Sequence, residues 1–342
     1  SLILSVVISS ICSAHEKKGA IRVSGLSALP DPVGFAGMIA GVSHDSLIVG
    51  GGANFPPPGD KKIYHDSIYI LDAPNGKWRK AKQRLPRPLA YAVSVTHRNR
   101  VICIGGNDDH RHFADVFAIV QTKTGVKIET LPSLPHPCSQ MCGALVGEVV
   151  YIAGGLKTPD ATKALKTFWA LDLSASKLRW KKLKPWPGPE RFQSVSGSLN
   201  GTFFLFSGIR LRNDKGKPAR ILPYLKDAYS FHPKTSKWKR LRDLPRPAPA
   251  GPPAISLMNS RLVLMSGADG SRIDIPWQKH PGFKNEIFAY DVAKDAWSKG
   301  GKMPKGSSRV TAPMTAWRGG YVIVSGERSP RIRSPKVYFL RR

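Results

Sequence analysis

Val101-Ile-Cys-Ile-Gly-Gly106, a short aliphatic run that ends in two small residues, is one of six such segments in this chain. The closing small-residue pairs begin at positions 51, 105, 154, 207, 266 and 325. Successive copies are therefore 54, 49, 53, 59 and 59 residues apart. A repeat of about 50 residues with this content is typical of a kelch-type β-propeller, in which each repeat forms one small sheet. We predict an all-β, six-bladed kelch-type propeller over residues 20–342.

Each repeat also carries candidate strands on both sides of its glycine step. A first strand precedes the step, as in residues 90–95, and a third strand follows a variable loop, as in residues 116–120. A fourth strand often begins at a tryptophan and ends in a proline-rich turn, as in residues 238–245. Tryptophans at this spacing pack between adjacent sheets, so we interpret them as structural rather than ligand-binding.

The sixth repeat reaches Arg342 before a fourth strand appears. The fourth-strand pattern occurs instead near the N-terminus, in residues 21–29 followed by Pro30. We therefore expect the N-terminal strand to complete the last blade, because ring closure removes the unpaired sheet edges of an open array.

The first 14 residues are apolar and uncharged, and they end in Ser13 and Ala14. This composition is typical of the apolar region and cleavage site of a secretory signal peptide, and the segment is short for a stable membrane span. We interpret residues 1–14 as the remnant of a signal peptide. A periplasmic or secreted location is the corresponding expectation.

The chain is strongly basic, with 53 lysines and arginines against 23 acidic residues, a formal net charge of +30. A positive field of this size attracts anions such as acidic sugars. The basic residues are spread over all six repeats without a recognisable nucleic-acid motif, so no nucleic-acid partner is expected. Cys103 is expected to be a buried thiol, and Cys138 and Cys142 are either free or paired. No cluster with metal-ligand spacing appears.

The predicted topology places candidate functional residues on one face. In an up-and-down blade, the loop after the second strand and the loop that enters the next first strand both surround the mouth of the central channel. A glutamate there can transfer a proton, and an arginine can bind a carboxylate in bidentate fashion. The residues alone allow either a catalytic set or an ion pair that ties loops together. The candidates are Glu327, Arg333, Arg191, Gln193, Asn54, Tyr91 and Asn107.

The chain resembles the bacterial N-acetylneuraminate epimerases, or sialic acid mutarotases, which are six-bladed kelch-type propellers, and specifically their circularly permuted relatives. Residues 34–55 and 88–106 resemble two consecutive late blades, and residues 188–193 with 232–238 resemble an early blade. Residues 325–333 match the family's Gly-Glu-x5-Arg segment, which is the most specific part of the resemblance. The rotated order of these segments is what a permutation implies.

The resemblance implies an isomerase that interconverts the α and β anomers of N-acetylneuraminate or a related acidic sugar. Glu327 is then the proton-transfer residue, and Arg333 is its partner or a substrate binder. Arg191 and Gln193 are implied to bind the substrate, and the reaction needs no metal or redox cofactor. Phe192 departs from the family pattern, where a more polar residue is expected.

Two other functions are compatible with parts of the sequence. A non-catalytic kelch-type module would bind an anionic glycan or a protein without turnover. A copper-dependent propeller oxidase would need converging tyrosine and histidine ligands and a cysteine that can be cross-linked. His110 and His112 are the nearest candidates for such ligands, and we interpret both as solvated loop residues.

Overall fold

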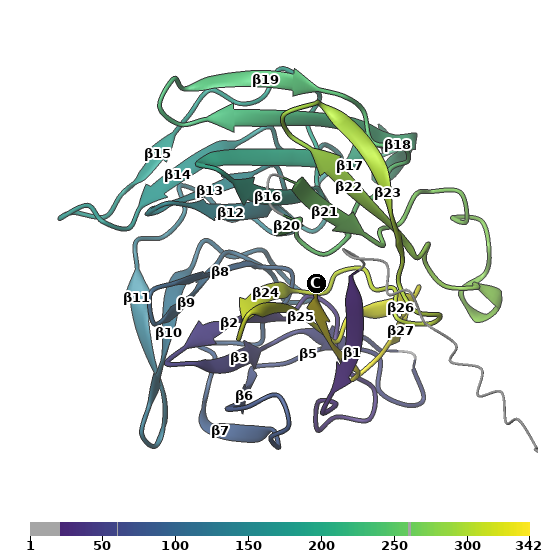
Figure 1. Ribbon diagram of the computed structural model, residues 1–342. Helices are drawn as coiled ribbons and strands as arrows, with labels where there is room; N and C mark the ends of the chain where they lie inside the picture. The colour runs from purple at the N-terminus through teal and green to yellow at the C-terminus, as the bar shows by residue number, and fades with distance from the viewer. Residues whose placement is uncertain (1–20, 60, 259–260) are drawn as a thin grey trace, which may run out of the picture.

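The six repeats fold into six four-stranded antiparallel sheets in the computed structural model of the protein (Figure 1). The structure describes residues 21–59, 61–258 and 261–342. The one helical element in these ranges is a single 3-10 turn, η1 (Trp277–Lys279). None of the helical structure described is long and apolar enough to cross a membrane. The predicted all-β class is confirmed, and the proposed signal segment 1–14 lies outside the described residues.

Sheets 1 to 6 are numbered here in chain order, and each is given from its inner to its outer strand. The first three sheets are β2 (Ile39–Ser43), β3 (Ser46–Gly50), β6 (Ser67–Leu71) and β7 (Arg79–Arg84); β8 (Val93–His97), β9 (Arg100–Ile104), β10 (Val116–Thr122) and β11 (Gly125–Leu131); and β12 (Cys142–Val146), β13 (Val149–Ala153), β14 (Phe168–Asp172) and β15 (Trp180–Lys182).

Sheets 4 to 6 have the same order of strands, and two short ladders project from the loops. These elements are β16 (Val195–Leu199), β17 (Thr202–Asp214), β18 (Lys217–His232) and β19 (Lys237–Leu241); β20 (Ile255–Met258), β21 (Arg261–Met265), β22 (Glu286–Asp291) and β23 (Ala296–Lys302); β24 (Met314–Trp317), β25 (Gly320–Val324), β28 (Val337–Arg341) and β1 (Arg22–Leu26); and the ladders β4 (Ala53–Asn54) with β5 (Ile63–Tyr64) and β26 (Glu327–Ser329) with β27 (Ile332–Arg333).

The N-terminal strand completes sheet 6, as predicted. Strand β1 pairs antiparallel with β28, from Arg22 opposite Arg341 to Leu26 opposite Val337. Figure 1 shows β1 beside the C-terminal strands. The inner strand of this sheet, β24, in turn contacts β2 of sheet 1. The two ends of the array therefore meet, which is the closed arrangement of a β-propeller.

A circle of backbone hydrogen bonds joins the starts of the six inner strands. Each N–H donates to a carbonyl of a neighbouring sheet over 2.7 to 3.0 Å, and the last bond returns to the first residue. All of its residues have φ between 50° and 68°, in the left-handed region. We call this circle the inner ring; it consists of Gly37, Tyr91, Gln140, Gln193, Ala250 and Thr311.

The fourth-strand tryptophans link neighbouring sheets, which confirms their structural interpretation. The indole N–H of Trp238 donates to the carbonyl of Lys184 over 2.8 Å, and that of Trp297 donates to the carbonyl of Arg242 over 3.1 Å. Trp180 makes the equivalent bond to Pro132. Each acceptor lies on the preceding sheet, so each indole fixes one sheet against the next.

The steps of sheets 1 to 3 begin with a glycine because another part of the backbone approaches that position closely. Gly154 has φ +69°, and a Cβ atom there would lie 2.3 Å from the carbonyl oxygen of Arg191. Gly147, in the turn between β12 and β13, has φ +59° but nothing within 4 Å of its Cβ position. The two glycines therefore have similar backbone conformations, but only Gly154 lacks the space for a Cβ atom.

We expect Gly154→Ala to lower the free energy of unfolding by about 1–3 kcal/mol more than Gly147→Ala. Both variants place alanine in the left-handed region, at a similar conformational cost. Only Gly154→Ala adds a clash with backbone that cannot rotate away. Urea denaturation measures the difference, and equal midpoints for the two variants would contradict the close approach.

Candidate active site

Glu327 and Arg333 face each other across the β26–β27 ladder. The two residues are paired in register, and Nη1 of Arg333 lies 3.1 Å from Oε1 of Glu327. The same carboxylate oxygen accepts the backbone N–H of Arg331 over 2.9 Å. The side chain of Arg333 is 3% exposed and that of Glu327 is 17% exposed. The structure thus places the carboxylate at the surface of a mostly buried ion pair.

The guanidinium of Arg333 is not fully satisfied by the protein. Its Nε donates weakly to the carbonyl of Ala53 over 3.5 Å, and its charge lies over the ring of Phe55 at 5.0 Å. Nη1 is close to Glu327 but has no hydrogen-bond acceptor in the described part of the chain. Nη1 is thus paired with the Glu327 carboxylate through charge, without a well-aligned hydrogen bond, and the protein encloses it.

Tyr91 joins the inner ring to this ion pair. The phenol has a pKa raised to about 12, chiefly because it is buried; the charge of Glu327 adds to the rise, and the charge of Arg333 and its hydrogen bond to the phenol oppose it. The phenol therefore remains protonated at neutral pH and can donate a hydrogen bond.

Lys62 and Tyr64 extend the site from the loop of sheet 1, and the sequence analysis did not identify either residue. The ammonium of Lys62 lies 4.5 Å from the centre of the Tyr91 ring and donates to the hydroxyl of Tyr64 over 3.0 Å. Asn107 donates to the same hydroxyl over 3.1 Å and accepts a hydrogen bond from Ser139. The predicted residue Asn107 is thus connected to Tyr91 through Lys62 and Tyr64.

Asn54 lies in the β4–β5 ladder of sheet 1, and its side chain is buried there. It is 2% exposed, and its side-chain oxygen is 2.8 Å from Nε2 of His65. Its neighbour Ala53 provides the carbonyl that Arg333 contacts. Asn54 therefore supports the backbone beneath Arg333, and its side chain does not point towards open solvent.

Gln193 belongs to a central cavity on the strand side of the inner ring. Its side-chain amide donates to Gln140 over 2.8 Å, and both residues line a cavity of about 130 Å³ together with Tyr91. Glu327 and Arg333 are not among the lining residues. Tyr91 is therefore the residue shared by the central cavity and the ion pair, and Gln193 is separated from the carboxylate.

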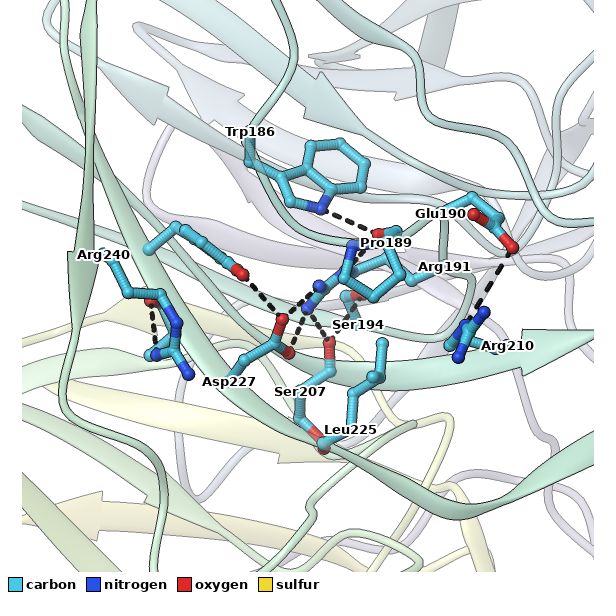
Figure 2. Close-up of polar contacts among 12 residues, drawn as sticks. Trp186, Pro189, Glu190, Arg191, Ser194, Ser207, Arg210, Leu225, Asp227 and Arg240 are labelled. Atoms are coloured by element: carbon cyan, nitrogen blue, oxygen red, sulfur yellow. Dashed lines mark hydrogen bonds and ion pairs between the residues drawn. The ribbon is translucent and has the colours of Figure 1, made fainter.

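The geometry does not favour the predicted contact between Arg191 and a substrate. Figure 2 shows its guanidinium directed towards Asp227 and Ser207. It forms a bidentate ion pair with Asp227, with bonds of 2.7 and 2.6 Å, and Nη1 also donates to the carbonyl of Ser207 over 2.8 Å. The side chain is 0% exposed. The carboxylate that Arg191 binds is therefore that of Asp227 in the same protein. The pair holds the loop between sheets 3 and 4 against strands β17 and β18.

Aromatic rings complete the enclosure of this second ion pair. The Arg191 guanidinium lies 5.4 Å from the Trp186 ring and 5.5 Å from the Tyr229 ring. The Tyr229 hydroxyl donates to Asp227 over 2.9 Å. Such a buried, fully bonded pair is strongly destabilised when one partner is removed.

The remaining histidine and cysteine predictions have mixed outcomes. His110 is exposed, but the interpretation of His112 as solvated is wrong: it is 6% exposed, and its Nδ1 lies 2.9 Å from the carbonyl oxygen of Leu156. Cys138 and Cys142 are buried free thiols. Across residues 21–59, 61–258 and 261–342, no group of three or more His, Cys, Asp or Glu side chains is arranged to hold a metal ion.

Comparison with known proteins connects this chain to one family. The family profile for N-acetylneuraminate epimerase matches residues 131–278, which include Arg191 and Gln193 but not Glu327 and Arg333. An N-acetylneuraminate epimerase of Haemophilus influenzae (strain 86-028NP) is 27% identical over 239 residues, 61% of this chain and 59% of the relative.

Further relatives agree with this match. The N-acetylneuraminate epimerase of Yersinia enterocolitica is 24% identical over 61% of this chain and 57% of its own length. That of Salmonella typhimurium is 24% identical over 65% of this chain and 61% of its own length. The alignments thus span about 60% of the length of these curated relatives. These matches relate the chain to the N-acetylneuraminate epimerase family.

Proposed function

We propose that this protein is a mutarotase that interconverts the α and β anomers of N-acetylneuraminate or a related acidic sugar. The observation that carries the proposal is the Glu327–Arg333 pair, in which the partly exposed carboxylate of Glu327 lies near the protonated phenol of Tyr91. The names of the related proteins support the same substrate class.

In the proposed reaction Glu327 accepts the proton of the anomeric hydroxyl. The electrons of that O–H bond form the C2 carbonyl, the bond between C2 and the ring oxygen breaks, and the ring oxygen takes a proton from an acid. Rotation about the bond between C2 and the adjacent ring carbon presents the other carbonyl face. The ring then closes by the reverse steps, so protons and electrons balance without an oxidant or reductant.

Tyr91 is the proposed acid for the ring oxygen. It is protonated at neutral pH and hydrogen-bonded with Arg333, beside Glu327. Lys62 adds a second positive charge near the phenol. The two cations favour an anionic substrate, and the guanidinium of Arg333 can orient the substrate carboxylate.

The proposal is tested by anomer-exchange NMR with two classes of sugar. N-acetylneuraminate should show α–β exchange that increases with protein concentration, whereas a neutral aldose such as glucose should exchange at its protein-free rate. Equal acceleration of both sugars would contradict selection through a carboxylate.

Tyr91→Phe should slow anomer exchange by about 100-fold, in the lower part of the range for loss of a general acid or base. The variant keeps the ring beneath Lys62 and removes only the hydroxyl that contacts Arg333. Tyr321→Phe is a matched control, because its hydroxyl donates to the backbone of Ser256 outside the site. An exchange rate for Tyr91→Phe equal to that of Tyr321→Phe would exclude the phenol as the acid.

A non-catalytic binding module is the second candidate, and one contact favours it. Oε1 of Glu327 is already held by the backbone of Arg331 and by Arg333, as in an ion pair that stabilises a hairpin. A module of this kind would bind the acidic sugar without accelerating exchange. The NMR experiment above separates the two functions.

Circular permutation is also part of the proposal. The related proteins align with only 61% to 65% of this chain, although the β-propeller continues through Arg341. A linear alignment of two permuted chains covers one segment and leaves the displaced one unmatched. The pairing of β1 with the C-terminal strand β28 is the ring closure that such a chain needs.

A further inference from the structure

A second cavity, of about 240 Å³, lies next to the candidate active site, and we call it the side cavity. It is formed by the loop between β21 and β22, by strand β18 and by the tip of the β26–β27 hairpin. That hairpin carries Glu327 and Arg333. The lining includes Arg220, Tyr224, Asp269, Arg272, Lys284 and Pro330.

Positive charge exceeds negative charge in the side cavity. Arg220, Arg272 and Lys284 line it, and within the described residues none of them forms an ion pair. The one carboxylate, Asp269, accepts hydrogen bonds from the backbone and hydroxyl of Ser271. Three cations against one carboxylate that already has bonding partners make a site that attracts an anion.

Internal hydrogen bonds hold two of these cations in place. Nη1 of Arg272 donates to the carbonyl of Gly282 over 2.7 Å, which holds the guanidinium in place. Arg220 donates to the hydroxyl of Tyr224 over 3.2 Å. Arginine side chains that are fixed in this way bind carboxylates with little further loss of conformational freedom.

Exposed apolar side chains, here called the apolar rim, lie on the elements that form the cavity, and one of them, Ile273, lines it. Among the described residues, the exposed large hydrophobic side chains are Leu222, Ile273, Ile275 and Trp277, with exposed fractions of 49%, 42%, 36% and 38%. All four lie on β18 or on the loop between β21 and β22. Exposed apolar side chains on elements that also form a charged cavity are typical of a ligand-binding surface.

The rim continues to the candidate active site. The ring of Trp277 lies 5.3 Å from the guanidinium of Arg331, and the backbone N–H of Arg331 holds the carboxylate of Glu327. Pro330, at the tip of the same hairpin, lines the side cavity. A ligand that reaches from Glu327 into the side cavity would thus pass over the tip of the β26–β27 hairpin and the indole of Trp277.

We propose that the side cavity binds the carboxylate of a second acidic sugar unit, linked to the unit whose anomeric centre lies at Glu327. The inference rests on the proposed function and extends its substrate class to the reducing end of short acidic oligosaccharides. Mutarotation requires only a free anomeric centre, so a glycosidic bond at another hydroxyl of that unit leaves the reaction unchanged.

The test compares three sugars with the full chain: N-acetylneuraminate, a disaccharide of two N-acetylneuraminate units, and a disaccharide whose second unit is a neutral hexose. Calorimetry should show that the diacidic disaccharide binds about fivefold more tightly than the neutral-capped one, as a partly exposed charge contact allows. Lys284→Gln and Arg272→Gln should each reduce this preference. Lys182→Gln, on the outer strand β15, should preserve it.

Lys284→Gln removes no hydrogen bond found among the described residues, although its charge also acts on Asp269, so a melting temperature is measured beside the affinity. Equal affinity for the two disaccharides, or a preference that persists in both Lys284→Gln and Arg272→Gln, would overturn the inference. Anomer exchange measured on the same sugars separates the two proposals. If exchange of the monosaccharide is accelerated without any preference for the diacidic sugar, only the side-cavity inference fails. If no sugar exchanges, the proposed function fails.

Discussion

Glu327→Gln should abolish the accelerated anomer exchange, with a loss of at least about 100-fold, the effect typical of a removed general base. The amide has the shape of the carboxylate but cannot accept the proton of the anomeric hydroxyl. Its oxygen can still accept the backbone N–H of Arg331, so the β26–β27 ladder should persist. Exchange NMR on N-acetylneuraminate measures the loss.

Glu148→Gln provides the matched control for this prediction. Glu148 also contacts an arginine, Arg98, and the imidazole of His97, but it lies on the hairpin of sheet 3. The control should exchange the anomers at the wild-type rate. If Glu327→Gln exchanges the anomers at the wild-type rate, Glu327 is not the base. A folding defect in this variant would instead appear as a lowered melting temperature.

Arg191→Met should lower the free energy of unfolding by about 3–5 kcal/mol, because it leaves Asp227 as a buried carboxylate without its partner. The bidentate pair, the carbonyl of Ser207 and the enclosing rings all depend on this guanidinium. Chemical denaturation of Arg191→Met and of the exposed control Arg212→Met gives the comparison. A loss no greater than that of the control would contradict the structural role.

A double variant shows whether the stability lost in Arg191→Met comes from the unpaired charge of Asp227 or from lost packing. Arg191→Met with Asp227→Leu removes both charges, so much of the lost stability should return. The folded fraction of Arg191→Met should still accelerate anomer exchange, since the guanidinium is 0% exposed. A folded Arg191→Met protein without activity would restore the substrate contact that the sequence suggested.

The repeats of the sequence predict the fold well because the first residue of each small-residue step is left-handed in all six sheets, as a serine in sheets 4 to 6 and as a glycine under a close backbone approach in sheets 1 to 3. Gly51, Gly105 and Gly154 all have φ between 62° and 69°, and a Cβ atom at each would lie 2.3 or 2.4 Å from a carbonyl oxygen. The inner ring has no such signal. Its left-handed residues are mostly not glycines, as Tyr91 and Gln193 show, so nothing in the residue types predicts the circle of hydrogen bonds.

The sequence predicts the part of the candidate site that depends on contacts between residues close together in the chain. The spacing of Glu327 and Arg333 corresponds to a tight two-stranded ladder, a local arrangement that the sequence can encode. Arg191 pairs with a carboxylate 36 residues away, and Lys62 reaches Tyr91 from another sheet. Such contacts depend on how loops of different repeats meet, which the period of the repeats does not specify.

The most direct test of the proposed function is the rate of α–β exchange of N-acetylneuraminate, measured by NMR with increasing amounts of the wild-type chain. We predict that the rate rises in proportion to protein concentration and that the increase disappears when Glu327→Gln replaces the wild-type chain. Exchange that stays at the protein-free rate at every wild-type concentration would contradict the proposed mutarotase.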